Sequence, residues 1–227
     1  MAILSANQVL YQYRNKYQTT HVLKGLSCSF DAGKIYALTG PSGSGKTTFL
    51  SLLAGLDCPS GGNIFFEQIS TEQLDRDQYR REHVSVIYQN FNLFSHLTML
   101  ENAAYPLYMR NVPRSEAEKI ASAQLLAVGL REEPFKRFPY MLSGGEQQRT
   151  AIARALSAGS EIILGDEPTG NLDQKNSRKI MEILKNLAHK EGKCVILVTH
   201  DLMIAQEADE IYNLRDGVLE STGKQEA

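Results

Sequence analysis

The sequence predicts an α/β fold in which helices cover a mainly parallel β-sheet. Short runs made only of apolar residues recur along the chain, and the clearest are Ile162–Leu164 and Val195–Val198. Strands that are apolar on both faces are buried on both, which is typical of parallel strands between two layers of helices. A second observation is that residues 90–141 have helical patterning with little strand signal. We therefore expect a sheet domain that carries a helical insertion.

The remaining elements follow in chain order. About the first 30 residues are rich in Tyr, Val and Thr and are expected to form antiparallel strands at one edge of the fold. Further apolar strands are expected at residues 34–39, 84–88 and 211–214. One helix ends before Gly192, and four apolar residues share its inner face: Ile180, Ile183, Leu184 and Leu187. The acidic end, residues 209–227, is expected to fray.

Residues 90–158 are interpreted as a helical subdomain within a single domain that spans residues 1–227. Thr98 and Glu101 have the spacing of a capping box, and so do Ser115 and Glu118. Gly129 suits the end of the second helix. Four residues before it recur at helical spacing and predict its buried face: Ala117, Ala121, Leu125 and Val128.

Composition excludes several classes of protein. Hydrophobic residues make up 42% of the 227 residues and charged residues 22%. These are ordinary globular values, and they exclude disordered, collagen-like and disulfide-dense proteins. The net charge of −2 lacks the basic surplus of a nucleic-acid binder, so no nucleic-acid partner is expected. Three cysteines without metal spacing indicate reduced thiols, and the start of the chain lacks signal-peptide features. We expect a cytosolic chain that does not itself span a membrane.

Residues 40–47, Gly-Pro-Ser-Gly-Ser-Gly-Lys-Thr, form a phosphate-loop motif. They lie between a predicted strand and the helical run Thr48–Leu56, which is the context that the motif requires. Its backbone N–H groups would surround phosphate oxygens, Lys46 would neutralise the β and γ phosphates, and Thr47 would ligate Mg²⁺. The predicted nucleotide-binding residues here are Gly40, Pro41, Ser42, Gly43, Ser44, Gly45, Lys46, Thr47 and Thr48.

Two adjacent carboxylates end the predicted strand at residues 162–164. Ligands of parallel α/β sheets bind beyond the carboxyl ends of the strands, so Asp166 is expected beside the phosphate loop, where it would hold Mg²⁺ through water. Glu167 lies one residue further and is expected to polarise an attacking water. An Asp-Glu pair can also simply begin a surface loop, and the phosphate loop is what favours the catalytic interpretation.

Residues 142–149, Leu-Ser-Gly-Gly-Glu-Gln-Gln-Arg, predict a second helix start that is open to an anion. Ser143 and Glu146 have capping-box spacing, while Gly144 and Gly145 leave the first turn unobstructed. Taken alone, this pattern is equally well explained as a well-capped helix. A further role needs a phosphate for it to contact.

The phosphate loop, the LSGGEQQR segment and residues 165–173, GDEPTGNLD, occur in this order and resemble the nucleotide-binding subunit of ABC (ATP-binding cassette) transporters. The resemblance covers nearly the whole chain. It implies a phosphate-loop NTPase with ABC ATPase architecture: a mainly parallel core sheet, an antiparallel β edge and a helical subdomain. It also implies that two copies pair head to tail, so that ATP and Mg²⁺ lie between the phosphate loop of one copy and Ser143, Gly144, Gly145 and Glu146 of the other.

The resemblance also implies roles for four further residues. Tyr13 would stack on adenine, although Tyr11 and Tyr17 lie nearby and Tyr13 could be an ordinary strand residue. The remaining three are Gln89, which would touch Mg²⁺ and the attacking water, His200, which would contact the γ phosphate, and Asp173, in the loop that crosses between subunits. The chain departs from the family pattern at Thr47, Gly165 and Thr150 without losing a catalytic group.

Spacing and local sequence narrow the type of ABC protein. Ser143 follows Lys46 by only 97 residues, which leaves no room for the long coiled coils of DNA-repair relatives. Residues 91–107 resemble the branch of macrolide exporters, lipoprotein-releasing systems and antimicrobial-peptide exporters. Within them, residues 91–97 are expected to receive a helix of a separate membrane permease, or else to be ordinary core.

This resemblance implies an ATPase motor at the cytoplasmic face of the membrane, attached through the permease. Two alternatives stay open: an ATPase that regulates a non-transporting membrane partner such as a cell-wall hydrolase activator, and a phosphate-loop kinase. The cargo is not encoded in this chain, because specificity in the family lies in the permease.

Overall fold

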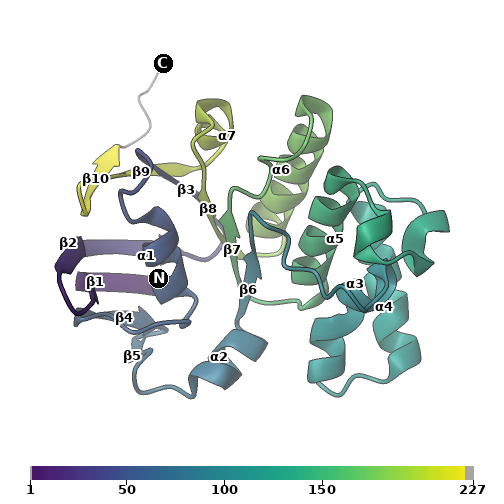
Figure 1. Ribbon diagram of the computed structural model, residues 1–227, viewed down its shortest axis with the longest axis horizontal. Coiled ribbons are helices and arrows are strands. Elements are labelled where there is room, and N and C mark those ends of the chain that lie inside the picture. Colours follow the sequence, from purple (N-terminus) through teal and green to yellow (C-terminus); the bar gives the residue numbers. More distant parts are fainter. Residues whose placement is uncertain (1, 223–227) are drawn as a thin grey trace.

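The computed structural model describes residues 2–222 and contains two β-sheets joined by helices (Figure 1). The strands are β1 (Ala2–Arg14), β2 (Thr19–Asp31), β3 (Ile35–Thr39), β4 (Gly61–Phe66), β5 (Ile69–Ser70), β6 (Val84–Ile87), β7 (Ile162–Asp166), β8 (Cys194–Val198), β9 (Glu210–Arg215) and β10 (Val218–Thr222). The α-helices are α1 (Lys46–Leu53), α2 (Arg76–Glu82), α3 (Met99–Met109), α4 (Arg114–Ala127), α5 (Gly144–Ser157), α6 (Gln174–His189) and α7 (Leu202–Gln206), and the 3₁₀ helices are η1 (Glu133–Lys136) and η2 (Pro139–Met141).

The larger sheet has six strands in the order β10-β9-β3-β8-β7-β6 and confirms the predicted mainly parallel sheet. Strands β9, β3, β8, β7 and β6 pair in parallel, and β10 pairs antiparallel with β9. In this register Val198 lies opposite both Leu38 and Asp166. The carboxyl ends of β3, β8, β7 and β6 therefore lie at one edge of the sheet, and the loops that follow them start side by side.

Burial on both faces explains the apolar runs. Along β3, Ile35 and Ala37 pack into one hydrophobic core, whereas Tyr36 and Leu38 pack into another. The first core lies between the sheet and helices α3–α6, and the second lies between the two sheets around α1. Alternate residues of a strand point to opposite faces, so each strand contributes to both cores.

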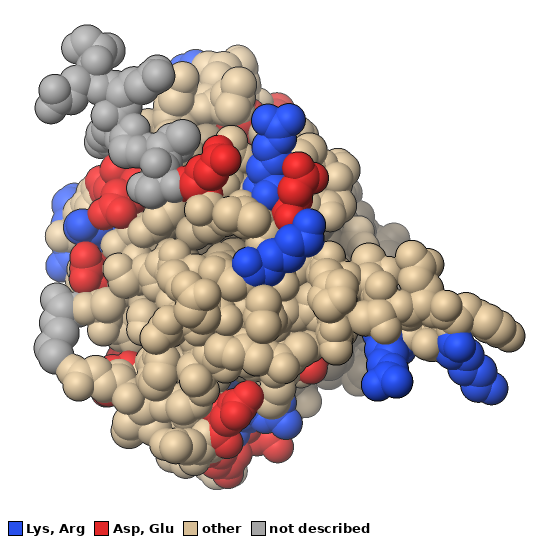
Figure 2. Space-filling view, turned by 90° about the vertical axis from the view of Figure 1, so that its left-hand side faces the viewer, with Lys and Arg blue, Asp and Glu red and all other residues tan. Residues whose placement is uncertain are grey.

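The smaller sheet has the order β2-β1-β4-β5 and is antiparallel throughout, as predicted for the N-terminal segment. Figure 2 shows the side of the molecule where β1 and β2 lie: uncharged side chains cover its centre, and Lys and Arg side chains lie scattered toward its margin. In the part of the chain that the structure describes, this face presents no continuous basic surface.

The prediction that residues 209–227 fray was wrong for residues 209–222. Strand β9 extends the parallel sheet beside β3, and its Tyr212 and Leu214 are buried in the core. The backbone N–H of Lys24 donates to the carbonyl of Gly217, so the turn after β9 is tied to β2. Acidic composition did not prevent the segment from contributing apolar side chains on one face. The rest of that prediction falls on residues 223–227, outside the described residues.

Between β6 and β7 the chain forms only helices: α3, α4, η1, η2 and α5. The capping box of Thr98 and Glu101 is present at the start of α3. The second predicted box was wrong, because Pro113 is the N-cap of α4 and Ser115 lies inside the first turn. Glu118 instead accepts a hydrogen bond of 2.7 Å from Nε of Arg114. The boundary of a helical subdomain at residues 90–158 stays a proposal.

Helix α4 buries the face that its spacing predicted: Ala117, Ala121, Leu125 and the residue after the helix, Val128, are fully buried. These side chains join the core that α3 and α5 also line. Over residues 2–222, no helix has the length and apolar character needed to cross a membrane.

Candidate functional site

The phosphate loop lies between β3 and α1 in a conformation that only glycine permits at two positions. Gly40 has φ +140°, and a Cβ there would lie 2.0 Å from the carbonyl oxygen of Leu214. Gly45 has φ +103°, and a Cβ there would lie 2.9 Å from Cγ1 of Val22. Gly45 is also the N-cap of α1 and provides no side-chain cap. The first N–H groups of α1 are therefore left for an external acceptor.

Lys46 is a cation whose hydrogen bonds go to neutral groups. Its Nζ donates to the carbonyl oxygens of Gly40 at 2.9 Å and Pro41 at 2.8 Å. Burial lowers the pKa of Lys46, although the nearby carboxylates of Glu167 and Asp166 oppose this effect. Ser44 is buried in the same loop, and its Oγ has no hydrogen-bond partner within residues 2–222. An ammonium on carbonyls and an unpaired hydroxyl both fit a phosphate group.

Thr47 and Asp166 bring a hydroxyl and a carboxylate together, although the two residues lie 119 positions apart in the sequence. Thr47 Oγ1 donates to Asp166 Oδ2 at 3.0 Å. Burial raises the pKa of Asp166, and the hydrogen bond from Thr47 partly offsets this rise. In residues 2–222 no three His, Cys, Asp or Glu side chains are grouped to hold a metal. The pair nevertheless fits Mg²⁺, which is usually held by one or two carboxylates together with substrate phosphates.

Glu167 lies at the centre of a cluster formed by three distant parts of the sequence. Its Oε1 is 2.7 Å from Nδ1 of His200, and its Oε2 accepts a hydrogen bond of 3.0 Å from Nε2 of Gln89. Glu167 has φ +49°, a left-handed conformation that costs energy in a residue with a side chain. Both carboxylate oxygens are thus held in place beside the phosphate loop.

Of the three neighbouring tyrosines, Tyr13 combines an exposed ring with a contact to α1. Its ring is 54% exposed, and its hydroxyl lies 3.3 Å from Thr48 Oγ1 on α1. Tyr11 is buried, its hydroxyl donates to Asp57, and this hydrogen bond raises its pKa to about 12. The Tyr11 ring packs edge-on against Tyr13, with 5.1 Å between the ring centres. Tyr17 is 95% exposed.

The turn that opens α5 forms the predicted capping box. Ser143 Oγ accepts from the backbone N–H of Glu146, and Glu146 Oε2 accepts from the backbone N–H of Ser143 at 2.8 Å. Hydrogen bonds from Ser143 lower the pKa of Glu146. A Cβ on Gly144 would meet no atom within 4 Å, whereas Gly145 approaches Leu172. We call residues 142–146 the signature turn.

The structure does not bring the signature turn to the phosphate loop. Helices α1 and α5 lie on opposite sides of β6 and β7 in Figure 1, well separated from each other. Asp173 caps α6, and its side chain accepts from the N–H of Asn176 at 2.9 Å. One copy of the chain therefore holds the catalytic cluster and the signature turn as two separate sites.

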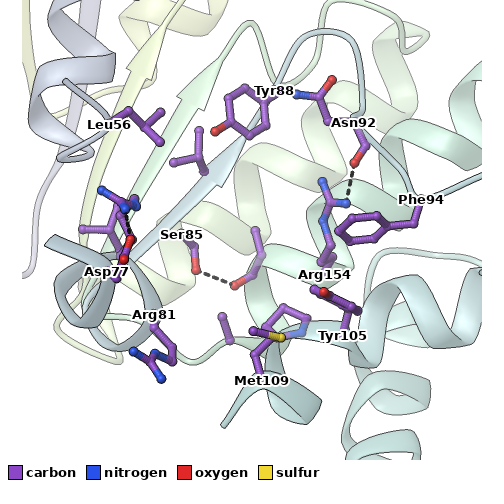
Figure 3. A pocket seen from close by; sticks show the side chains of 16 residues that line it. Leu56, Asp77, Arg81, Ser85, Tyr88, Asn92, Phe94, Tyr105, Met109 and Arg154 are labelled. Atoms are coloured by element: carbon purple, nitrogen blue, oxygen red, sulfur yellow. Dashed lines mark hydrogen bonds and ion pairs between the residues drawn. The ribbon is translucent and has the colours of Figure 1, made fainter.

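An open cavity of about 760 Å³ lies between α2, β6, α3 and α5 (Figure 3). Its wall is mainly apolar and includes Leu56, Phe94 and Met109. Arg154 also lines it, with its guanidinium 5.9 Å from the centre of the Phe94 ring. The guanidinium donates to the carbonyls of Phe91 at 2.9 Å and Asn92 at 2.6 Å. The cavity therefore reaches the segment that follows Gln89, where residues 91–97 were expected to receive a partner.

Sequence reasoning missed three residues that support these sites: Asp57, Gln148 and Arg154. Gln148 is fully buried, and its amide donates to the carbonyl of Pro168 at 2.8 Å. The available signal was a polar residue on the buried face of an otherwise apolar helix stripe, which requires a partner. Asp57 gave no comparable signal, because acidic residues after a helix are usually exposed.

The fold and the site together define a nucleotide-binding ATPase of the phosphate-loop class. Residues 23–170 match the family model described as ABC transporter, and the chain belongs to this family. The lipoprotein-releasing system ATP-binding protein LolD of Hydrogenovibrio crunogenus is 40% identical over 95% of this chain and 94% of its own length. The macrolide export ATP-binding/permease protein MacB 2 of Aeromonas hydrophila is 40% identical over 95% of this chain, which spans only 34% of that longer protein.

Solved structures agree with this assignment. The dimeric structure of the ABC transporter cassette MJ0796 of Methanocaldococcus jannaschii matches with a TM-score of 0.92 and 38% identity, and 96% of each chain is covered. A second structure of that cassette is described as a dimeric post-hydrolysis state bound to ADP and Pi, and it also has a TM-score of 0.92. The present chain is thus an ABC-type ATPase, the ATP-binding cassette of an ABC transporter, as its motifs predicted.

Proposed function

We propose that this chain is a motor subunit that dimerises on ATP and drives a separate membrane permease. The observation that carries the proposal is the separation of two half-sites. The phosphate loop with Glu167 lies at the sheet edge, and the signature turn lies apart from it at the start of α5. The phosphate loop leaves the first N–H groups of α1 without a side-chain cap, and Gly144 leaves the first turn of α5 open to an external group. A head-to-tail pair would complete both.

The proposed division of labour at the phosphate end follows from the contacts. Lys46 and the N–H groups of the loop bind phosphate oxygens, while Thr47 and Asp166 hold Mg²⁺, which supplies charge neutralisation when bound. Glu167 accepts a proton from the attacking water, since His200 and Gln89 fix its two oxygens. Gln89 would also touch Mg²⁺, and His200 would contact the γ phosphate.

The proposed ATP contacts come from two copies. Tyr13 stacks on the adenine, and residues 40–48 surround the phosphates. The partner copy contributes its own signature turn, Ser143, Gly144, Gly145 and Glu146, and the loop with Asp173. The dimeric state of the MJ0796 cassette supports this arrangement.

A Gly144→Ala variant tests the head-to-tail pair. Within one copy a Cβ at this position has open space, and Ala is favoured over Gly in a helix by up to about 1 kcal/mol. We therefore expect a normal or slightly raised melting temperature, but loss of the ATP-dependent dimer in size-exclusion chromatography with light scattering. Glu167→Gln is the background, so that ATP persists. Unchanged dimerisation of Gly144→Ala would contradict the proposal.

The proposed permease site is the cavity beside Phe94. Its apolar wall and its link through Arg154 to the segment after Gln89 suit an inserted helix whose position alters the catalytic cluster. The proposed setting is the cytoplasmic face of the membrane. The proposed activity is export or force transmission for a peptide, a lipoprotein or a hydrophobic antimicrobial compound. Two of these cargo classes are supported by relatives, since LolD is named for lipoprotein release and MacB 2 for macrolide export.

A matched pair of surface substitutions tests this site. Met109 lines the cavity and is 52% exposed, whereas Leu126 lies on α4 away from the cavity and is 44% exposed. Met109→Glu should abolish co-purification with the permease encoded beside this gene while basal ATPase activity persists, and Leu126→Glu should retain the complex. Retention of the permease by Met109→Glu would contradict docking at this cavity.

A further inference from the structure

Helix α5 touches the catalytic loop through one buried amide. Gln148 is fully buried, and its Nε2 donates to the carbonyl of Pro168, the residue after Glu167, at 2.8 Å. Its Oε1 is buried without a hydrogen-bond partner in residues 2–222. The contact with Pro168 is therefore the polar interaction that fixes the orientation of this amide, since reversing the amide would place an oxygen against the Pro168 carbonyl.

The absence of a side chain at Gly165 leaves room for the ring of Pro168. A Cβ at Gly165 would lie 3.0 Å from Cγ of Pro168 and 2.9 Å from Cδ2 of Leu197. The proline ring thus lies closer to β7 than a side chain at position 165 would allow.

In the sequence, Glu167 lies between Gly165 and Pro168. Its backbone N–H is bonded to the carbonyl of Val198 at 2.9 Å, and its φ of +49° turns the chain sharply before Pro168. A left-handed residue persists only where its surroundings impose that conformation. Two neighbours hold Pro168, the residue after Glu167, and so favour this conformation. Gly165 leaves room for the proline ring, and Gln148 binds the proline carbonyl.

We propose that Gln148 and Gly165 are positioning residues that set Pro168 and thereby aim the Glu167 carboxylate at His200 and Gln89. The proposal rests on the proposed role of Glu167 in hydrolysis. It adds a link between the two half-sites, because Gln148 belongs to the same helix as the signature turn. The first turn of α5 also approaches the loop that continues from Pro168, since a Cβ on Gly145 would lie 3.7 Å from Cδ2 of Leu172. A displacement of α5 by the partner's nucleotide would therefore move Pro168.

The first test replaces Gln148 by Met, which keeps the length of the side chain and removes the donor. We expect kcat for ATP to fall by about 10-fold to 100-fold with KM unchanged, because misplacement of a catalytic group by about 1 Å can cost as much as 100-fold. Gln147→Met is the matched control. Gln147 lies next to it on α5, and its amide donates to the carbonyl of Leu142 rather than to the catalytic loop.

The second test adds Gly165→Ala, alone and combined with Gln148→Met. Gly165→Ala should also lower kcat at constant KM, because the new Cβ must displace Pro168 or Leu197. If both residues act through Pro168, the double variant should lose less than the product of the two single losses, since residues that share a partner are non-additive.

A purely structural role is separated by dimerisation and melting. In a Glu167→Gln background, Gln148→Met should still form the ATP-dependent dimer, and its melting temperature should stay close to that of Gln147→Met. Wild-type kcat in Gln148→Met, equal losses in Gln147→Met, or loss of the dimer would each overturn the inference. Unimpaired turnover in Glu167→Gln alone would instead overturn the proposed function on which it rests.

Discussion

The six-stranded sheet holds a histidine-carboxylate pair at each end, and the two pairs have opposite surroundings. At the amino end of the strands, His189 lies 2.8 Å from Asp209, whose Oδ2 also accepts from the backbone N–H of Ile35. At the carboxyl end, His200 lies 2.7 Å from Glu167. Glu167 has a left-handed backbone, whereas Asp209 does not.

The lysines at the two ends differ in the same way. Lys34, at the amino end, pairs with Glu210 at 2.7 Å and Asp31 at 3.5 Å. Lys46, at the carboxyl end, donates to two carbonyl oxygens. Similar side chains thus serve the folded state at one end of the sheet, where charges are paired. At the carboxyl end, the charge of Lys46 and the strained backbone of Glu167 are available to act on a substrate.

The largest effect expected from this comparison is in Glu167→Gln. General-base catalysis contributes about 100-fold to 10,000-fold, so kcat should fall by that factor while ATP still binds and the ATP-bound dimer accumulates. The amino-end counterpart, Asp209→Asn, should keep kcat within about twofold and lower the free energy of unfolding by about 1–3 kcal/mol, because it weakens a charge-assisted hydrogen bond.

Phosphate-release assays and urea unfolding of both variants separate these outcomes. The two ends would have the same role if Glu167→Gln hydrolysed ATP normally, or if Asp209→Asn lost turnover without losing stability.

A smaller effect is expected from the lysines. Lys46→Met removes charge-assisted hydrogen bonds to phosphate, which contribute about 1.5–3 kcal/mol, so the Kd for ATP should rise by about 10-fold to 100-fold. Lys34→Met should leave the Kd unchanged and change the stability little, since its ion pairs are partly exposed. Fluorescent-nucleotide titration measures both constants, and an equal Kd in Lys46→Met and Lys34→Met would remove the distinction.

Much of the fold could be predicted because buried parallel strands leave apolar runs in the sequence. Residues 162–164 and 195–198 lie in neighbouring strands of the observed sheet. The strand predicted at residues 211–214 lies within β9, but β10 was not predicted, because only its first two residues, Val218 and Leu219, are apolar. The capping pattern at Ser115 was overridden by Pro113, which starts the helix two residues earlier than the box requires.

The sequence predicted those features of the site that lie within a single motif. The motif spacing placed Lys46 at a helix start and Asp166 at a strand end, and both lie there. It could not give the contacts of Glu167 with His200 and Gln89, because these depend on which strands are neighbours and in what register. Gln148 was hidden for the same reason, since its partner Pro168 lies 20 residues away in the sequence.

The smallest expected effect concerns the pH dependence of stability at Asp166. Burial raises the pKa of this carboxyl above its ordinary value of 3.8, so the folded protein holds the proton more tightly than the unfolded chain does. Its ionisation therefore opposes folding: stability falls as the pH rises from 3.8 through the folded pKa, and the cost persists at pH 7. Asp166→Asn should remove this cost.

Without nucleotide, we expect Asp166→Asn to raise the free energy of unfolding at pH 7 by less than about 1 kcal/mol, because the group is only partly buried. The gain should vanish near pH 3, where the wild-type carboxyl is protonated in both states. Glu101 provides a control of opposite sign, because hydrogen bonds from Thr98 lower its pKa. Its stabilising contribution is present above its unfolded pKa of 4.5 and is lost as the pH falls through the folded value, so Glu101→Gln should lower stability at pH 7. Urea unfolding at both pH values measures these changes. A loss of stability in Asp166→Asn at pH 7 would show that this carboxylate supports the fold as Asp209 does. The contrast between the two ends of the sheet would then not include Asp166.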